Sequence, residues 1–192
     1  MRFLLIFSIL FLTNYSLWSQ PLPKVEFQTP PGKIVVEIDT VHAPVTAKNF
    51  LEHVENGTFK NAVFYRTVRK DNQPNNDIKI EVIQGGLYSD AEIEKHPGIQ
   101  HETTKETGLK HLDGTISMAR NEPGTASTEF FICMGSQPEL DFGGKRNSDG
   151  QGFAAFGKVL NGMDVVRKIQ QLPDENQYLK EPVKIHSIKM IQ

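Results

Sequence analysis

From Lys33 onward, the chain consists mainly of short apolar segments that are separated by polar stretches rich in glycine, asparagine and proline. Seven segments have the composition of strands: 33–39, 63–68, 78–84, 114–120, 127–135, 152–159 and 183–191. In the first of them, KIVVEID, apolar residues alternate as in a strand with one buried face. Many short strands and few helices predict a mainly β protein, an antiparallel barrel whose open ends are covered by helices.

Two segments have helical spacing instead. Residues 42–57 (HAPVTAKNFLEHVENG) place Pro44 where a first helical turn accepts proline, and residues 163–172 (MDVVRKIQQL) follow Asn161, a suitable N-cap. Apolar residues recur on one face of each: Ala47, Phe50, Leu51 and Val54 in the first, and Met163, Val166 and Ile169 in the second. We therefore expect one early and one late helix.

The N-terminal residues have the pattern of a secretory signal peptide. Arg2 precedes the apolar run 3–12 (FLLIFSILFL), and small residues at Ser16 or Ser19 suit a cleavage site. We expect a signal peptide over 1–19, a proline-rich tether over 20–32 and one domain over 33–192, exported to the periplasm or beyond the cell. A buried N-terminal strand and a membrane anchor are the alternatives, although a bilayer needs roughly 20 apolar residues.

Composition excludes several function classes. The chain has 21 basic and 23 acidic residues and no basic run, so we expect no nucleic-acid partner and no membrane contact after signal removal. Cys133 is the single cysteine, which permits no internal disulfide; it is either an inert core thiol or a nucleophile. No histidine spacing suits a metal, and no nucleotide-binding motif occurs, so we expect neither metal nor cofactor, and a monomer.

Six motifs occur in an order that resembles one family. They are FYR (64–66), IQGG (83–86), GTISMAR (114–120), EFFI (129–132), LDF (140–142) and FAAFGKVLNGMDVV (153–166). Together they resemble the cyclophilin family of peptidyl-prolyl cis-trans isomerases over residues 33–192. The resemblance implies a closed eight-stranded antiparallel β-barrel capped by two α-helices, with an external groove that binds X-Pro segments. The partners would be proline-containing unfolded or flexible polypeptides, and an exported member would assist the folding of exported proteins.

The resemblance also implies roles for individual residues. Arg66 would be the catalytic donor, since arginine stays charged and presents a rigid fork of N–H groups, and Gln84 would orient it. Val82, Phe131, Leu140 and Phe153 would form the wall of a proline slot, and Ala119, Arg120 and Asn121 would hold the residues that precede the proline. Core packing is the alternative for the apolar residues, a surface salt bridge is the alternative for Arg66, and a strand-ending turn is the alternative for Gln84.

Three glutamates depart from the family pattern. Glu81 replaces a slot phenylalanine, Glu129 replaces a glutamine, and Glu139 replaces a tryptophan tied to cyclosporin binding, so we expect weak binding of that drug. Glu81 and Glu129 are therefore candidate modulators of the arginine. They motivate a second hypothesis, a proline-binding or chaperone-like module with little turnover. Alternatively, the long loop RKDNQPNNDIK shifts Glu81 out of the slot.

Overall fold

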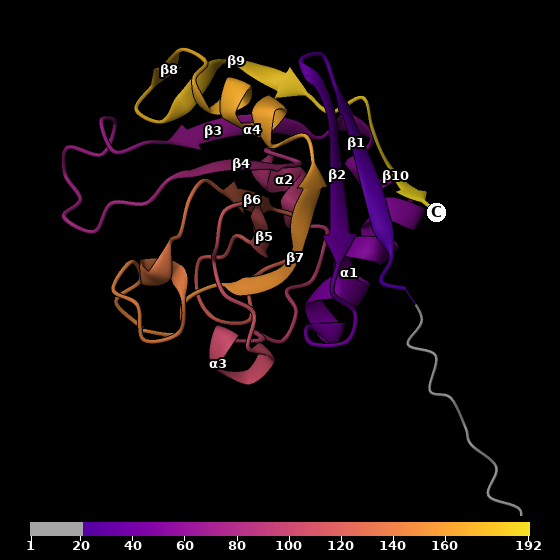
Figure 1. Ribbon diagram of the computed structural model, residues 1–192, viewed down its shortest axis with the longest axis horizontal. Coiled ribbons are helices and arrows are strands. Elements are labelled where there is room, and N and C mark those ends of the chain that lie inside the picture. The colour runs from indigo at the N-terminus through magenta and orange to yellow at the C-terminus, as the bar shows by residue number, and fades with distance from the viewer. Residues whose placement is uncertain (1–20) are drawn as a thin grey trace, which may run out of the picture.

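The computed structural model describes residues 21–192 and shows one antiparallel sheet and four helices (Figure 1). The strands are β1 (Lys24–Thr29), β2 (Gly32–Ile38), β3 (Val63–Val68), β4 (Val82–Gly86), β5 (Thr115–Met118), β6 (Phe130–Cys133), β7 (Ala154–Asn161), β8 (Asp174–Glu175), β9 (Tyr178–Lys184) and β10 (Ser187–Ile191). The signal peptide predicted over 1–19 lies outside the described residues.

The mainly β, antiparallel prediction is confirmed, but the closed eight-stranded barrel is not. Within residues 21–192 the sheet has ten strands in the order β10-β1-β2-β7-β5-β6-β4-β3-β9-β8, so β10 and β8 stand at its two ends. The segment 183–191 is divided between β9 and β10 at Ile185 and His186, where its alternation slips. The two-residue strand β8 is too short to produce a sequence pattern.

The proline-rich tether predicted over 20–32 is wrong for Lys24–Thr29. These residues form β1, which pairs with β2 on one side and β10 on the other. The four prolines of that stretch flank the strand and do not interrupt KVEFQT, so every ladder N–H of the strand remains. Val25 and Phe27 are fully buried, and the domain therefore begins before Lys33.

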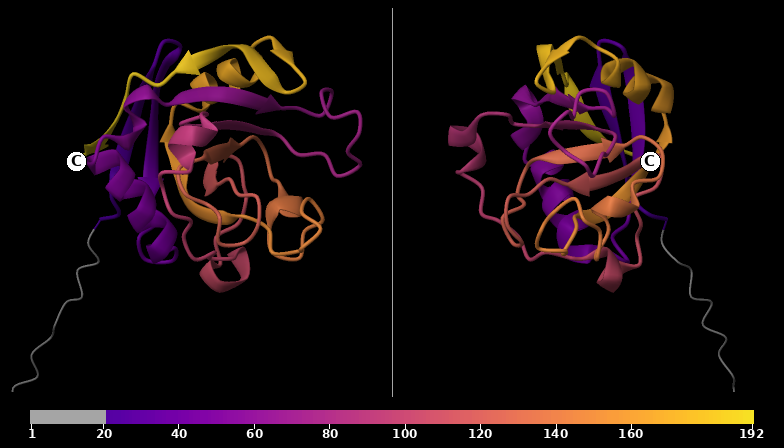
Figure 2. Two further views of the ribbon diagram at one scale, coloured as in Figure 1. Left: turned by 180° about the vertical axis from the view of Figure 1, so that it is seen from behind. Right: turned by 90° about the vertical axis from the view of Figure 1, so that its left-hand side faces the viewer.

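Both expected helices are present, as α1 (Pro44–Glu55) and α4 (Met163–Gln170). α1 contacts β7 and β10, whereas α4 contacts β2, β3 and β4, so the two helices cover different parts of the sheet (Figure 2). The N-cap of α4 is Gly162, not Asn161, because the left-handed φ of 95° there favours glycine. One-turn helices α2 (Asp90–Ile93) and α3 (Thr104–Thr107) and 3₁₀ turns η1 (Thr58–Asn61) and η2 (Pro138–Leu140) were not expected.

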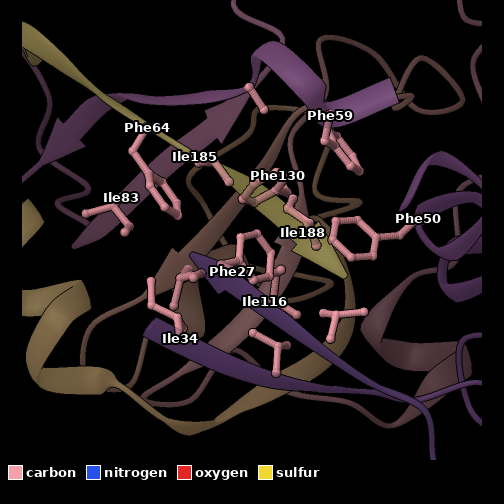
Figure 3. Packing of buried hydrophobic residues seen from close by; sticks show 14 of the residues in the cluster. Phe27, Ile34, Phe50, Phe59, Phe64, Ile83, Ile116, Phe130, Ile185 and Ile188 are labelled. Atoms are coloured by element: carbon pink, nitrogen blue, oxygen red, sulfur yellow. The ribbon is translucent and has the colours of Figure 1, made fainter. Parts of the chain in front are cut away.

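Most buried apolar side chains of residues 21–192 belong to one of two clusters. The larger one contains Phe27, Phe50, Phe64 and Phe130, whose rings pack between the sheet and α1 (Figure 3). The smaller one, which we call the outer cluster, consists of Val68, Ile80, Val82, Phe131, Cys133 and Leu140. Because successive strand residues face opposite sides, the neighbours Phe130 and Phe131 belong to different clusters. This alternation places Phe131 on the face where the family resemblance expects the proline slot.

The outer cluster also accounts for Cys133. The thiol is fully buried, and burial raises its pKa well above the ordinary value. A thiol that remains protonated and inaccessible is a poor nucleophile, which favours the inert interpretation. Across the described part of the chain, no helix is long and apolar enough to cross a membrane, and no three metal-ligating side chains are grouped.

Candidate functional site

A groove of about 380 Å³ lies over the outer cluster. Its lining consists of Tyr65, Arg66, Ile80, Val82, Gln84, Ala119, Arg120, Asn121, Phe131, Leu140, Arg146, Asn147, Phe153 and Tyr178. The structure thus brings together all nine residues predicted as catalytic or substrate-binding. Five further lining residues were missed from the sequence, namely Tyr65, Ile80, Arg146, Asn147 and Tyr178.

Arg66 and Gln84 are register partners across the β3–β4 ladder. The ladder shifts between Phe64 and Arg66, as at a β-bulge, and such a shift re-aims side chains beside a site. Nη1 of Arg66 donates a 3.0 Å hydrogen bond to Oε1 of Gln84. The two polar residues on apolar strands are therefore a cross-strand pair.

A second glutamine, missed from the sequence, holds the other edge of the same guanidinium. Oε1 of Gln177 accepts from Nε of Arg66 at 3.2 Å and from Nη2 at 2.5 Å. Gln177 belongs to the β8–β9 hairpin, which lies beside β3 (Figure 1). Its φ of 75° is left-handed, a conformation that is uncommon for a residue other than glycine. Its Nε2 donates to the backbone oxygen of Asn72 at 3.2 Å, which fixes the amide.

The hairpin is itself anchored to the loop after β3. Asp174 accepts hydrogen bonds from the guanidinium of Arg69 and from Nδ2 of Asn72, and its second oxygen also accepts from the backbone N–H of Gln177. Asp174 is nearly buried, and hydrogen bonds from Arg69 and Asn72 keep its pKa below the usual range despite burial, which alone would raise it. A rigid network therefore sets the position of Gln177.

Arg66 itself is largely buried, and burial lowers its pKa from the usual value. Arginine remains protonated at any pH at which the fold exists. Among residues 21–192 no carboxylate forms an ion pair with it; its held partners are the two neutral amides. Of its five N–H groups, three are used, so one hydrogen on each Nη is left for a ligand in the groove.

The apolar part of the groove is centred on Phe131. The Phe153 ring meets it edge-on, with centroids 5.2 Å apart, and Val82 and Leu140 belong to the same cluster. Behind it, the buried ring of His111 stacks on Phe131 at 5.9 Å. These residues both line the groove and pack against one another, so slot lining and core packing, the two alternatives from the sequence, are both correct for them.

His111 is fixed by two hydrogen bonds and was missed from the sequence. Its Nδ1 lies 2.8 Å from Oδ1 of Asp141, and its Nε2 lies 3.0 Å from Oγ of Ser117. Both His111 and Ser117 are buried, so the group has no access to a ligand and acts as support for Phe131. Nothing in the local pattern around KHLDG distinguishes such a histidine from a surface one.

Arg120 has its charge neutralised within the protein. Its guanidinium binds both oxygens of Asp149, at 2.8 and 2.9 Å, and the carbonyl of Gly152. It also lies over the Phe153 ring, 5.3 Å from the centroid. The side chain therefore braces the slot and the adjoining loop, and it also donates to the backbone oxygen of Asn121 at 3.1 Å. The backbone N–H groups of Ala119 and Asn121 donate to the backbone oxygen of Glu129 and to Oγ1 of Thr125.

Glu81 lies outside the groove, contrary to the modulator role predicted for it. Its carboxylate pairs with Lys70 at 3.4 Å, and Ile80 lines the groove in its place. Val82 and Gln84 line the groove as predicted, so alternation along this segment places Ile80 on the groove face and Glu81 on the opposite face. Glu139 is also outside, where its carboxylate accepts from the backbone of Lys145 at 2.8 Å.

Glu129 is buried on the far side of Tyr65 and does not contact Arg66. Its Oε1 accepts from the backbone N–H of Leu87 at 2.6 Å, and its carboxyl faces the Tyr65 hydroxyl. Burial raises the pKa of Glu129, although these hydrogen bonds oppose the shift. Tyr65 in turn accepts from Nε2 of Gln84 at 2.6 Å. The chain Glu129–Tyr65–Gln84–Arg66 therefore links the carboxyl to the guanidinium.

Comparison with known proteins agrees over nearly the whole described chain. The family model described as "Cyclophilin type peptidyl-prolyl cis-trans isomerase/CLD" matches residues 24–190. Peptidyl-prolyl cis-trans isomerase A of Dickeya dadantii is 34% identical over 172 residues, which cover 85% of this chain and 82% of that protein. Peptidyl-prolyl cis-trans isomerase B of Escherichia coli is 34% identical over 154 residues, which cover 76% of this chain and 83% of that protein.

Solved structures share the fold. A cyclophilin-type peptidyl-prolyl cis-trans isomerase of Cryptosporidium parvum superposes with a TM-score of 0.70 at 22% identity, covering 89% of this chain and 98% of that one. The same protein, crystallised in the presence of the dipeptide Ala-Pro, gives a TM-score of 0.69 at 23% identity, covering 88% and 99%. At such identities the likeness establishes the fold.

Proposed function

The chain belongs to the cyclophilin-type peptidyl-prolyl cis-trans isomerase family, and we propose that Arg66 is the residue with which it catalyses the rotation of X-Pro bonds. Its activity is that of a peptidyl-prolyl cis-trans isomerase. The observation that supports the assignment is the guanidinium of Arg66, which lines the groove, is held between Gln84 and Gln177 and keeps one unused hydrogen on each Nη.

The chemistry requires no nucleophile. Rotation about the prolyl bond is opposed by about 18–20 kcal/mol of lost amide resonance. At the twisted state the nitrogen lone pair is no longer delocalised, so a donor aimed at the nitrogen stabilises that state more than the planar one. Arg66 is held in advance by two amides and reorganises little on binding. Gln84 and Gln177 act on the reaction by positioning it.

The remaining lining residues divide into two parts. The slot of Val82, Phe131, Leu140 and Phe153 would hold the proline ring, and the backbone over 119–121 would hold the residues that precede it. A relative crystallised with Ala-Pro supports proline-containing peptides as the ligand class. The substrates would be unfolded or flexible segments, because the chain on both sides of an X-Pro bond must be extended to enter the groove.

The test is exchange spectroscopy by NMR on a short Ala-Pro peptide, in which cis and trans forms give separate signals. We expect residues 21–192 to accelerate the exchange strongly, and Arg66→Ala to lower kcat/KM by about 100-fold or more. Arg167→Ala, at an exposed site on α4, is the control that should match the parent. Equal rates for the parent and Arg66→Ala would contradict the role of Arg66.

A proline-binding module without turnover is the second candidate, and the site gives it little support. This candidate requires carboxylates close to Arg66. Instead, Glu81 pairs with Lys70, Glu139 accepts from the backbone N–H of Lys145, and Glu129 faces Tyr65. A titration that shifts the Phe131 resonances without accelerating exchange would favour this candidate.

We further propose that the protein acts on exported polypeptides, as a monomer. The support is the apolar run 3–12 behind Arg2. N-terminal sequencing of protein recovered from the periplasm and the medium would test the export and give the cleavage site. A chain that retains Met1 in the cytoplasmic fraction would contradict it.

A further inference from the structure

Three arginines line the groove, and only one of them is neutralised. Arg120 is bound by Asp149, whereas no carboxylate within residues 21–192 pairs with Arg66 or Arg146. The chain as a whole has a formal charge of −2, so this positive groove stands out against an acidic protein. Arg66 has a role in the proposed mechanism, whereas Arg146 has no role in it.

Arg146 is fixed in place through one end of its guanidinium. Nη1 donates to Oε1 of Gln73 at 3.1 Å and to the backbone oxygen of Ile78 at 2.6 Å. Gln73 is itself buried and bonded to the backbone of Ile80. These contacts use both hydrogens of Nη1, and Nε and Nη2 have no partner in the described part of the chain. The open Nε–Nη2 edge is the fork that binds a carboxylate with two parallel hydrogen bonds.

The position of Arg146 along the groove is the second observation. A neighbouring hollow is lined by Ala119, Arg120 and Asn121 on one side and by residues near Glu129 on the other. Neither Arg146 nor Leu140 lines this hollow. Ala119, Arg120 and Asn121 line both hollows, whereas Arg146 lines only the main groove, together with Ile80, Val82 and Leu140. The loops of Arg146 and its partners lie on one side of the molecule (Figure 1). If residues before the proline follow 119–121, Arg146 faces the residues after it.

We propose that Arg146 forms a subsite for an acidic side chain that follows the proline, so that the protein prefers X-Pro-Glu and X-Pro-Asp segments. The inference rests on the proposed function, because the direction of the peptide comes from it. A substrate carboxylate would supply the counter-charge that the groove lacks. Burial and the charge of Arg66 lower the pKa of Arg146, as expected for a cation that lacks a neutralising partner.

The experiment compares three peptides, acetyl-Ala-Ala-Pro-Xaa-Ala-amide with Glu, Gln or Lys at Xaa, by NMR exchange at low ionic strength. Glu and Gln have nearly the same shape, so their ratio of kcat/KM isolates the charge. We expect a ratio of about 3 to 10 in favour of Glu, and Lys below Gln. The preference should weaken at about 0.5 M salt, because ions screen a partly exposed pair.

Variants assign the preference to its residue. Arg146→Gln should bring the Glu-to-Gln ratio close to one, and the Gln peptide in the same variant calibrates any general loss of activity. Arg146→Lys keeps the charge without the fork and should give an intermediate ratio, which also covers the case that Arg146→Gln does not fold. Arg167→Gln, at the exposed pair with Asp113, is the matched control and should keep the parent ratio.

The outcomes separate the two proposals. A parent ratio near one with clear acceleration of the Gln peptide would overturn the acidic subsite and leave the isomerase assignment intact. No acceleration of any of the three peptides would overturn the catalytic assignment of the groove, and the subsite with it. A preference that survives in both Arg146 variants would show that other residues cause it, and the assignment to Arg146 would be wrong.

Discussion

Arg66 and Gln177 are 111 positions apart in sequence, yet one amide oxygen of Gln177 accepts two hydrogen bonds from the arginine. With Gln84 on the other side, the guanidinium has a partner on each flank. A flexible side chain that is held in this way needs little ordering when substrate binds. The positioning of Arg66 thus depends on the β8–β9 hairpin, which is adjacent to β3 in the sheet but distant in sequence.

The first prediction removes Gln177. Gln177→Gly keeps the left-handed backbone without strain and deletes the amide, so we expect kcat to fall about 5- to 20-fold with KM changed less than about twofold. Asn176→Gly, at a neighbouring exposed residue that also has positive φ, is the matched control. An unchanged kcat in Gln177→Gly, measured by NMR exchange, would show that Gln84 alone is sufficient.

The second prediction concerns Tyr65. Tyr65→Phe leaves Nε2 of Gln84 without its 2.6 Å acceptor, so the amide is free to turn away from Arg66. We expect kcat to fall about 3- to 10-fold and the free energy of unfolding to fall by about 1 kcal/mol. Tyr178→Phe, at a groove residue whose hydroxyl makes no hydrogen bond within residues 21–192, tests whether the effect is specific. Equal losses in both variants would contradict it.

The third prediction is a pH dependence of stability through Glu129. Burial raises its native pKa above the ordinary 4.5 of the unfolded chain, so the native state holds the proton more tightly. The resulting stabilisation is complete below about pH 4 and is lost as the pH rises through the native pKa. A tenfold difference in proton affinity between the native and unfolded states corresponds to about 1.4 kcal/mol. Urea unfolding of the parent and Glu129→Gln between about pH 4 and pH 8 measures the loss.

Glu129→Gln should not lose this stability, so its free energy of unfolding should increase relative to that of the parent as the pH rises. A difference in unfolding free energy that stays constant over the same pH range would show that the carboxyl titrates alike in both states.

The fourth prediction follows from the position of Glu81. Its carboxylate pairs with the exposed Lys70 outside the groove, so Glu81→Gln should change kcat/KM by less than about twofold. Ile80→Ala, one residue earlier, removes part of the outer cluster that lines the groove and should lower kcat/KM several-fold. The reverse ranking of these two variants would mean that Glu81, and not Ile80, lies in the groove.

Much of the site was predictable because strands impose a period of two. The motif FYR places Arg66, EFFI separates Phe130 from Phe131, and both assignments need only alternation and the family resemblance. Glu81 shows where the family pattern alone fails. Val82 and Gln84 line the groove, so alternation already places Glu81 on the opposite face, although the family pattern expects a slot residue at that position.

Gln177, His111 and Arg146 were missed for a different reason. Each acts through a partner far away in sequence: Arg66, Phe131 and Gln73 respectively. A polar residue in a loop has the same local pattern whether it contacts solvent or a buried group, so only the folded chain distinguishes them. The strand β1 was missed because four flanking prolines hid a six-residue segment that contains none.

The pairing of β1 with β10 has a consequence for the order of synthesis. A ribosome makes the chain from its N-terminus, so β1 can pair with β2 early but gains its second neighbour only when residue 191 has been added. Gln177 reaches Arg66 equally late. A nascent chain that already contains Arg66, Gln84 and Phe131 therefore lacks a completed site. The chain therefore cannot isomerise its own prolyl bonds before its synthesis is nearly over.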